Sequence, residues 1–177
     1  MDKISVLISK EAIETRIQEM ADRLNREYAG QEVHLVGILK GSVFFVCELA
    51  KRLSMPVTMD FMSVSSYGAG TESTGRVKIV MDLAESIQDK NVIIVEDIID
   101  SGNTLNYLLS VLSNRNPASL RLITLLDKPD RRVKEVPIDD TGFTIPDAFV
   151  VGYGLDYAQR YRNLPFIGVV EPGAGEE

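Results

Sequence analysis

The chain has 177 residues, of which 45% are hydrophobic and 25% are charged, as in an ordinary soluble globular protein with a sizeable core. Its net charge of −7, without a long basic run, argues against nucleic acid or an anionic membrane as the main partner. Cys47 is the single cysteine, so no internal disulfide can form, which fits an intracellular protein. We see no signal peptide and no apolar run of about 18 residues, so we expect a cytoplasmic protein.

The first third of the chain predicts a strand, a helix, a second strand and a second helix. Residues 4–8 form a candidate short strand. Residues 9–28 predict an amphipathic helix with its apolar side chains on one stripe, and Gly30 is placed to end it. The nearly continuous apolar run 33–39 predicts a buried parallel strand, and residues 43–53 predict a helix.

The next segment is less regular. Residues 57–64 predict a strand, whereas residues from about 65 to 76 are rich in serine, glycine and threonine and lack hydrophobic periodicity. We interpret this stretch as a flexible lid loop, with plain disorder as the alternative. A strand pattern resumes over residues 76–81, and residues 82–88 predict a helical turn.

The second half of the chain returns to alternating strands and helices. Residues 92–95 predict a strand buried on both faces, and a helical pattern follows it to about residue 112. Further apolar runs predict strands over residues 120–126, 149–154 and 165–170.

This order of elements predicts an α/β fold, in which a central, mostly parallel, twisted sheet is flanked by helices. Residues 57–81 and the two chain ends look like additions around that core, and we also expect a small hood region. No linker divides the sequence, so residues 1–177 are expected to form one domain with a frayed tail at 172–177.

The chemistry is concentrated directly after the strand at 92–95. Glu96 and Asp97 are placed where that strand ends, which is the usual ligand crevice of an open parallel sheet. Residues 101–104 are small and polar and open a helix, so unpaired backbone N–H groups lie beside the positive end of its dipole. Together these features indicate a sugar phosphate, with its phosphate on the loop and its ribose on the acids. The alternative is a plain connection with solvated acids and a capped helix.

Two further residues attract attention because of their type. His34 lies inside the strand at 33–39 and has no histidine or cysteine partner at metal-ligand spacing, so we interpret it as structural. Cys47, in the helix at 43–53, is most simply a small packed side chain.

The full string from Val92 to Thr104 closely resembles the phosphoribosyl-pyrophosphate signature of the type I phosphoribosyltransferases. Four other segments extend the resemblance to the bacterial hypoxanthine phosphoribosyltransferases within that family. They are Leu-Lys-Gly-Ser at 39–42, Ser-Ser-Tyr-Gly at 65–68, Leu-Leu-Asp-Lys-Pro at 125–129, and the long run at 149–162. The resemblance implies the type I fold and an enzyme that joins a 6-oxopurine to phosphoribosyl pyrophosphate and releases pyrophosphate.

The resemblance also implies roles for individual residues of the central stretch. Glu96 and Asp97 would bind the ribose hydroxyls and Mg²⁺. Asp100 would be the catalytic base, accepting a proton from the purine N7 as the glycosidic bond forms. The 5′-phosphate would be held by Asp100, Ser101, Gly102, Asn103 and Thr104.

The flanking motifs supply the rest of the implied site. Pyrophosphate would be bound by Lys40, Gly41, Ser66, Tyr67 and Arg162, and in this family the Lys40–Gly41 dipeptide often contains a cis peptide. The purine would be bound by Lys128, which donates to the 6-oxo group, by stacking on Phe149, by the Val150 backbone and by Asp156. Asp156 would also bind a second Mg²⁺ or a water. Taken singly, Phe149 would be a core residue and Lys128 a solvated turn lysine.

Two other functions remain as alternatives. One is a non-catalytic regulator that senses phosphoribosyl pyrophosphate and acts on nucleic acid, which the acidic chain and the presence of Asp100 and Lys128 disfavour. The other is a transferase for xanthine or adenine, although adenine is hard to reconcile with Lys128. The implied partners are therefore small molecules, with no nucleic acid and no membrane, in a homodimer or homotetramer as is usual in the family.

Overall fold

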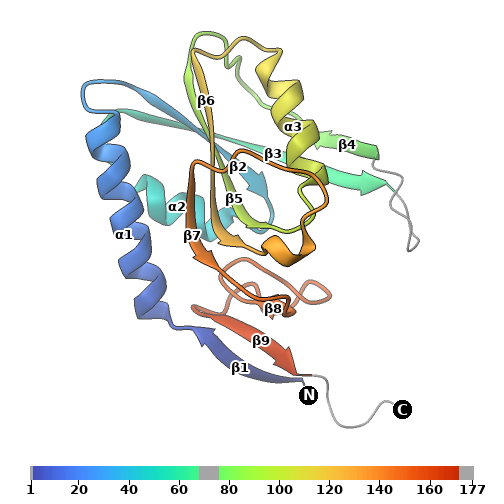
Figure 1. Cartoon of the computed structure of the whole chain (residues 1–177). Coiled ribbons are helices and arrows are strands. Elements are labelled where there is room, and N and C mark those ends of the chain that lie inside the picture. Colours follow the sequence, from blue (N-terminus) through green and yellow to red (C-terminus); the bar gives the residue numbers. More distant parts are fainter. Residues whose placement is uncertain (1, 68–75, 172–177) are drawn as a thin grey trace.

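The computed structural model describes residues 2–67 and 76–171, and within them a six-stranded sheet forms the centre of the molecule (Figure 1). Its strands lie in the order β4, β3, β2, β5, β6, β7. All neighbouring pairs are parallel except β3 and β4. Their bounds are β2 (Val33–Leu39), β3 (Val57–Tyr67), β4 (Arg76–Met81), β5 (Asn91–Ile99), β6 (Ser119–Asp127) and β7 (Asp140–Thr144). The α/β fold with a mostly parallel sheet is thereby confirmed.

Helices cover both faces of this sheet, with α1 (Lys10–Glu27) and α2 (Val43–Ala50) on one side and α3 (Asn103–Ser113) on the other (Figure 1). The side chain of Ser9 caps α1 by accepting a hydrogen bond from the Ala12 N–H at 3.1 Å. The helix ends at Glu27 with Tyr28 as its C-cap, and Gly30 follows two residues later with a φ of +74°. The second helix is shorter than predicted and ends at Ala50.

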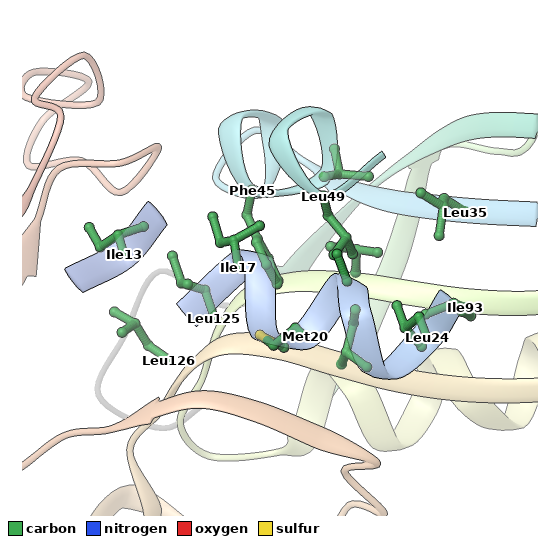
Figure 2. Close-up of a cluster of buried hydrophobic side chains, with 14 of the residues drawn as sticks. Ile13, Ile17, Met20, Leu24, Leu35, Phe45, Leu49, Ile93, Leu125 and Leu126 are labelled. Carbon is green, nitrogen blue, oxygen red and sulfur yellow. The ribbon is translucent and has the colours of Figure 1, made fainter. Parts of the chain in front are cut away.

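Alternate side chains of β5 enter two separate hydrophobic clusters, one on each face of the sheet. Ile93 and Val95 pack with α1 and α2, and Figure 2 shows Ile93 beside the apolar stripe of α1 and the buried side of α2. Val92 and Ile94 pack with α3 on the opposite face. A strand with apolar residues at consecutive positions is buried on both faces in this way, as the sequence predicted.

The chain ends meet in a second, antiparallel sheet with the order β1, β9, β8. Its strands are β1 (Lys3–Ile8), β8 (Val150–Val151) and β9 (Ile167–Glu171), and they lie below the central sheet in Figure 1. This sheet corresponds to the predicted hood. The strand predicted at 149–154 is only two residues long because Gly152, Tyr153 and Gly154 all have positive φ.

The segment 57–81 was wrongly assigned to the additions around the core. Its strand β3 pairs in parallel with β2 along the whole of that strand, and β4 extends the same sheet. The helical turn predicted at 82–88 is absent from the described residues, because Asp60 Oδ2 accepts the Ala84 and Glu85 N–H groups at 2.8 and 3.1 Å. Residues 68–75 of the predicted lid and the tail 172–177 lie outside the described residues.

Strand β7 had no signal in the sequence, because its five residues are mostly polar and include Gly142. It pairs in parallel with β6, and the Arg16 guanidinium of α1 donates to the Gly142 and Thr141 carbonyls at 3.0 and 2.8 Å. No helix of the described part of the chain is long and apolar enough to cross a membrane.

Candidate active site

The loop between β5 and α3 has the geometry of a phosphate cradle. Gly102 is the N-cap of α3 with a φ of +79°, and its carbonyl accepts the Asn106 N–H at 2.9 Å. A cleft of about 160 Å³ opens beside the loop, and its lining includes Asp100, Ser101 and Thr104. No acidic residue occupies the first turn of α3, so the positive end of the helix dipole is uncompensated within the helix itself. The predicted phosphate residues are therefore brought together at a helix N-terminus.

Residues 133–134, for which the sequence predicts no role, support this loop from behind. The N–H groups of Val133 and Lys134 both donate to the Ser101 carbonyl, at 2.8 and 3.0 Å. A Cβ atom on Gly102 would stand 2.2 Å from the Lys134 carbonyl oxygen, so the position requires glycine both for its φ and for space. The sequence contains no signal for this contact, because nothing in the composition of residues 133–134 indicates which loop they meet.

Glu96 and Asp97 lie within β5 rather than after it, because the strand continues to Ile99. Glu96 is 5% exposed, and the Asp97 N–H donates to its Oε1 at 3.1 Å. Burial, and then the adjacent Asp97 carboxylate, raise the pKa of Glu96 well above its usual range. Burial likewise raises the pKa of Asp97. Two such carboxyls favour a ligand that brings positive charge or hydroxyl donors.

Glycines bring the ends of β2 and of the hood close to Asp97. A Cβ atom on Gly41 would stand 1.7 Å from Asp97 Oδ2, and one on Gly154 would stand 2.0 Å from the Gly41 carbonyl oxygen. Among the described residues, the one non-proline cis peptide joins Leu39 to Lys40, one bond earlier than the bond singled out by the resemblance.

Two cations converge beside this glycine contact. Lys40 Nζ and Arg162 Nη2 both lie within hydrogen-bonding distance of Gln159 Oε1, at 3.2 and 3.3 Å. Arg162 also donates to the Gly154 carbonyl at 2.7 Å and pairs with Asp156 Oδ1 at 3.3 Å. Three of the residues predicted for pyrophosphate, Lys40, Gly41 and Arg162, are thus brought together. Gln159 carried no signal of its own in the sequence.

The remaining pyrophosphate candidates, Ser66 and Tyr67, are the last two residues of β3, where their backbones pair with β4. The other carboxylate of the site, Asp156, makes two contacts of its own. Besides Arg162, it accepts the Gln159 N–H on Oδ2 at 2.8 Å, so both of its oxygens have protein partners.

The purine candidates lie at the end of β6 and at the start of β8. Lys128 is 7% exposed, its N–H donates to the Ile99 carbonyl at 2.9 Å, and its Nζ lies 3.8 Å from Asp147 Oδ1. Lys128 is therefore not a solvated turn lysine. Phe149 is 53% exposed and makes an edge-to-face contact with Tyr157 at 5.4 Å, so it is not a core residue either. Its neighbour Val150 is buried.

Of two predictions for residues outside the site, the structure agrees with one and contradicts the other. His34 is buried, and its Nδ1 lies 2.7 Å from Thr58 Oγ1, in keeping with the structural role expected of it. Cys47 is exposed, so the prediction that it packs inside was wrong; α2 presents that face to solvent. The described residues contain no group of three or more histidine, cysteine, aspartate or glutamate side chains able to hold a metal ion.

Comparison with known proteins places the chain in a family. The family model described as the phosphoribosyl transferase domain matches residues 7–158. The chain therefore belongs to the phosphoribosyltransferase family. Within that family its relatives include hypoxanthine phosphoribosyltransferases, which confirms the narrower resemblance read from the motifs.

Three similarities carry this conclusion. The hypoxanthine-guanine phosphoribosyltransferase of Bacillus subtilis is 48% identical over 171 residues, covering 97% of this chain and 95% of that protein. The crystal structure of a hypoxanthine phosphoribosyltransferase from Staphylococcus aureus matches with a TM-score of 0.93 and 46% identity, covering 98% of this chain and 94% of that one. The bifunctional protein TilS/HprT of Listeria monocytogenes is 50% identical over 167 residues, which span 94% of this chain but only 26% of that protein.

Proposed function

We propose that the protein transfers the 5-phosphoribosyl group of phosphoribosyl pyrophosphate to N9 of hypoxanthine or guanine, giving IMP or GMP and pyrophosphate. One observation carries the proposal: the Lys128 N–H bonds to the Ile99 carbonyl at 2.9 Å. This backbone bond holds Lys128, whose side chain is buried, beside the strand end that leads into Asp100 and the phosphate loop. A hydrogen-bond donor for the purine follows β6, and a phosphate loop follows the neighbouring strand β5. This arrangement suits a reaction that joins a purine to a sugar phosphate.

The phosphoribosyl group is anchored first. The 5′-phosphate lies at the N-terminus of α3 and accepts hydrogen bonds from the loop of Asp100, Ser101, Gly102, Asn103 and Thr104. The ribose hydroxyls donate to the Glu96 and Asp97 carboxylates. The leaving pyrophosphate is held by the Lys40 and Arg162 cations and by the Gly41 backbone, because a guanidinium fork matches phosphate oxygens. Ser66 and Tyr67, the last two residues of β3, belong to the same pyrophosphate site in this proposal.

The purine is oriented by groups from two segments. Lys128 donates to the 6-oxo group, Phe149 stacks on the ring, and the Val150 backbone reads the ring edge. The exposure of Phe149 supports the stacking role, since a packed core phenylalanine would have no free face. Asp156 completes this side of the pocket through its contact with Arg162.

Bond formation then requires one proton acceptor. N9 attacks the anomeric carbon as its bond to pyrophosphate breaks, and the purine loses its N7 proton to the Asp100 carboxylate. Asp100 is exposed at the mouth of the loop, and its carboxylate accepts the Ser101 N–H. General-base assistance of this kind contributes about 10²- to 10⁴-fold.

The cofactor that we propose is Mg²⁺. Glu96, Asp97 and Asp156 supply oxygen donors, although no three acidic side chains of the described residues form a closed metal site. Magnesium is usually held by one or two carboxylates, with waters and substrate phosphates as its other ligands, so this donor set fits it. The ion would neutralise charge on the leaving pyrophosphate.

The test is a spectrophotometric assay with phosphoribosyl pyrophosphate, Mg²⁺ and, in turn, hypoxanthine, guanine, xanthine and adenine. We expect turnover with hypoxanthine and guanine, loss of turnover on adding a chelator, and recovery with excess Mg²⁺. Faster turnover of xanthine than of hypoxanthine or guanine would change the proposed substrate to xanthine. No turnover with any base, alongside measurable binding of phosphoribosyl pyrophosphate, would favour the regulator instead.

We also propose that the protein is one domain that assembles as a homodimer or homotetramer. Exposed Val80 and Met81 on the edge strand β4 support self-association, because an apolar sheet edge is a natural surface for a second copy. Sedimentation velocity at several protein concentrations measures the assembly directly. A monomer at every concentration would contradict this part of the proposal.

A further inference from the structure

The guanidinium of Arg132 joins the ends of the two central strands. Its Nε donates to the backbone carbonyl of Asp100 at 2.9 Å, and its Nη2 pairs with Asp127 Oδ1. The side chains of Arg132 and Asp127 are only 12% and 16% exposed. Asp127 is the last residue of β6 and stands opposite Ile99 of β5, so this one side chain spans the sheet edge on which the proposed site is built.

Arg132 touches the phosphate loop at a second point. A Cβ atom on Gly102 would stand 3.1 Å from Arg132 Cδ, so the arginine stem packs against the N-cap of α3. The two residues that follow Arg132 donate their N–H groups to the Ser101 carbonyl. The loop is therefore held at three consecutive positions, 100, 101 and 102, by one short segment of chain.

The chemistry of this contact suits positioning rather than simple stability. A largely buried ion pair recovers little net free energy after both charges are desolvated. What it supplies is direction, because the planar fork of arginine fixes two acceptors relative to each other. Here those acceptors are the Asp127 carboxylate, next to Lys128, and the backbone carbonyl of Asp100. Both lie where a strand passes into a loop of the proposed purine site.

We propose that Arg132, oriented by Asp127, is a positioning residue that fixes the backbone of Asp100 and so aims its carboxylate at the purine. The inference rests on the proposed function, in which Asp100 accepts the purine proton. Arg132 does not itself touch the reacting atoms. Its effect on turnover is therefore transmitted through Asp100, and this dependence distinguishes it from an arginine that only holds the fold together.

A double-mutant cycle measures that dependence. We expect Arg132→Gln to lower kcat about tenfold or more in the otherwise unchanged protein, since a small misplacement of a catalytic group costs up to about 10²-fold. In an Asp100→Asn background the same substitution should lower kcat by less than about threefold, because the group that it positions no longer accepts a proton. The KM for phosphoribosyl pyrophosphate should change little.

Arg115→Gln is the matched control. Arg115 pairs with Asp82 through two bonds of 2.7 and 2.9 Å. It follows the C-terminal end of α3, whereas the phosphate loop lies at the N-terminal end, so its loss removes an ion pair without a contact to the loop. We expect kcat to stay unchanged in that variant. Arg132→Lys keeps the positive charge but loses the planar guanidinium. If Arg132→Gln unfolds below the assay temperature, Arg132→Lys replaces it in the double-mutant cycle.

The outcomes separate the inference from the proposed function. One outcome is that the wild-type protein turns over hypoxanthine while Arg132→Gln lowers kcat by the same factor in the wild-type and Asp100→Asn backgrounds. The two substitutions would then act independently, and the positioning role would be wrong. Full activity of Arg132→Gln would also overturn it. If the unchanged protein turns over no purine at all, the proposed function fails, and the inference fails with it.

Discussion

Gly41 and Asp97 lie in van der Waals contact although 56 positions separate them: a Cβ atom on Gly41 would stand 1.7 Å from Asp97 Oδ2 and 2.5 Å from its Cγ. The contact joins the end of β2 to the acidic pair of β5, which are neighbouring strands. It brings the proposed pyrophosphate and ribose sites together. Neither residue type alone indicates this arrangement.

Gly41→Ala should displace the Asp97 carboxyl without unfolding the protein, because a carboxyl group can rotate away from a new methyl group. We expect the affinity for phosphoribosyl pyrophosphate to fall about tenfold, corresponding to about 1.4 kcal/mol of binding free energy. Isothermal titration calorimetry measures it. Gly30→Ala is the control: its Cβ meets nothing within 4 Å, but its φ of +74° strains alanine, so stability should drop by about 1 kcal/mol with unchanged affinity. Equal affinities in both variants would remove the role of the Gly41 contact.

Asp100→Asn should bind phosphoribosyl pyrophosphate nearly normally, because the amide oxygen can still accept the Ser101 N–H. Turnover should fall by a factor of about ten or more, since an amide cannot take the purine proton. Steady-state kinetics with hypoxanthine, together with a binding titration, separates the two effects. Full activity in this variant would rule out the general-base assignment.

Lys128→Ala should weaken discrimination against adenine. Lys128 is buried and faces a carboxylate, so its ammonium is available as a fixed donor to a 6-oxo group and repels a 6-amino donor. The ratio of kcat/KM for hypoxanthine to that for adenine should fall about tenfold or more. Measured over both bases, an unchanged ratio would show that another group reads this position of the purine.

Acid should destabilise the protein partly through His34. Burial, and then Lys90, lower the pKa of His34 below 6.5, while Asp60, Glu32 and Glu85 act in the opposite direction. The unfolded chain therefore binds a proton that the folded chain rejects as the pH falls below about 6.5. Stability from this residue is constant above that pH and is lost below it, with a slope of at most about 1.4 kcal/mol per pH unit.

His34→Asn tests this contribution because asparagine does not titrate and can still bond to Thr58. Urea unfolding of both proteins between pH 7.5 and about pH 5 should give a shallower acid slope for the variant. Parallel slopes would mean that carboxylates, and not His34, account for the loss of stability in this range.

Local sequence determined most of the secondary structure. The strand Val33–Leu39 was predicted to the residue, because an apolar run long enough for one buried strand has few other solutions. Likewise Ser9 caps the start of the first helix, and Gly30, with a positive φ, lies two residues beyond its C-cap Tyr28. The sequence from 92 to 104 also predicted a ligand site beside a helix N-terminus, because strand, small-residue loop and helix are contiguous in the chain. The structure has a cleft there.

Tertiary structure decided whatever depends on neighbours far apart in the sequence. Strand β7 forms because its backbone pairs with β6 and Arg16 binds its carbonyls, and Arg132 reaches Asp100 because β5 and β6 end side by side. Gln159 meets Lys40 only because the hood folds back over the end of β2. Local preferences act over a few residues, whereas these contacts follow from the order of strands in the sheet, and that order is fixed by the packing of the whole chain.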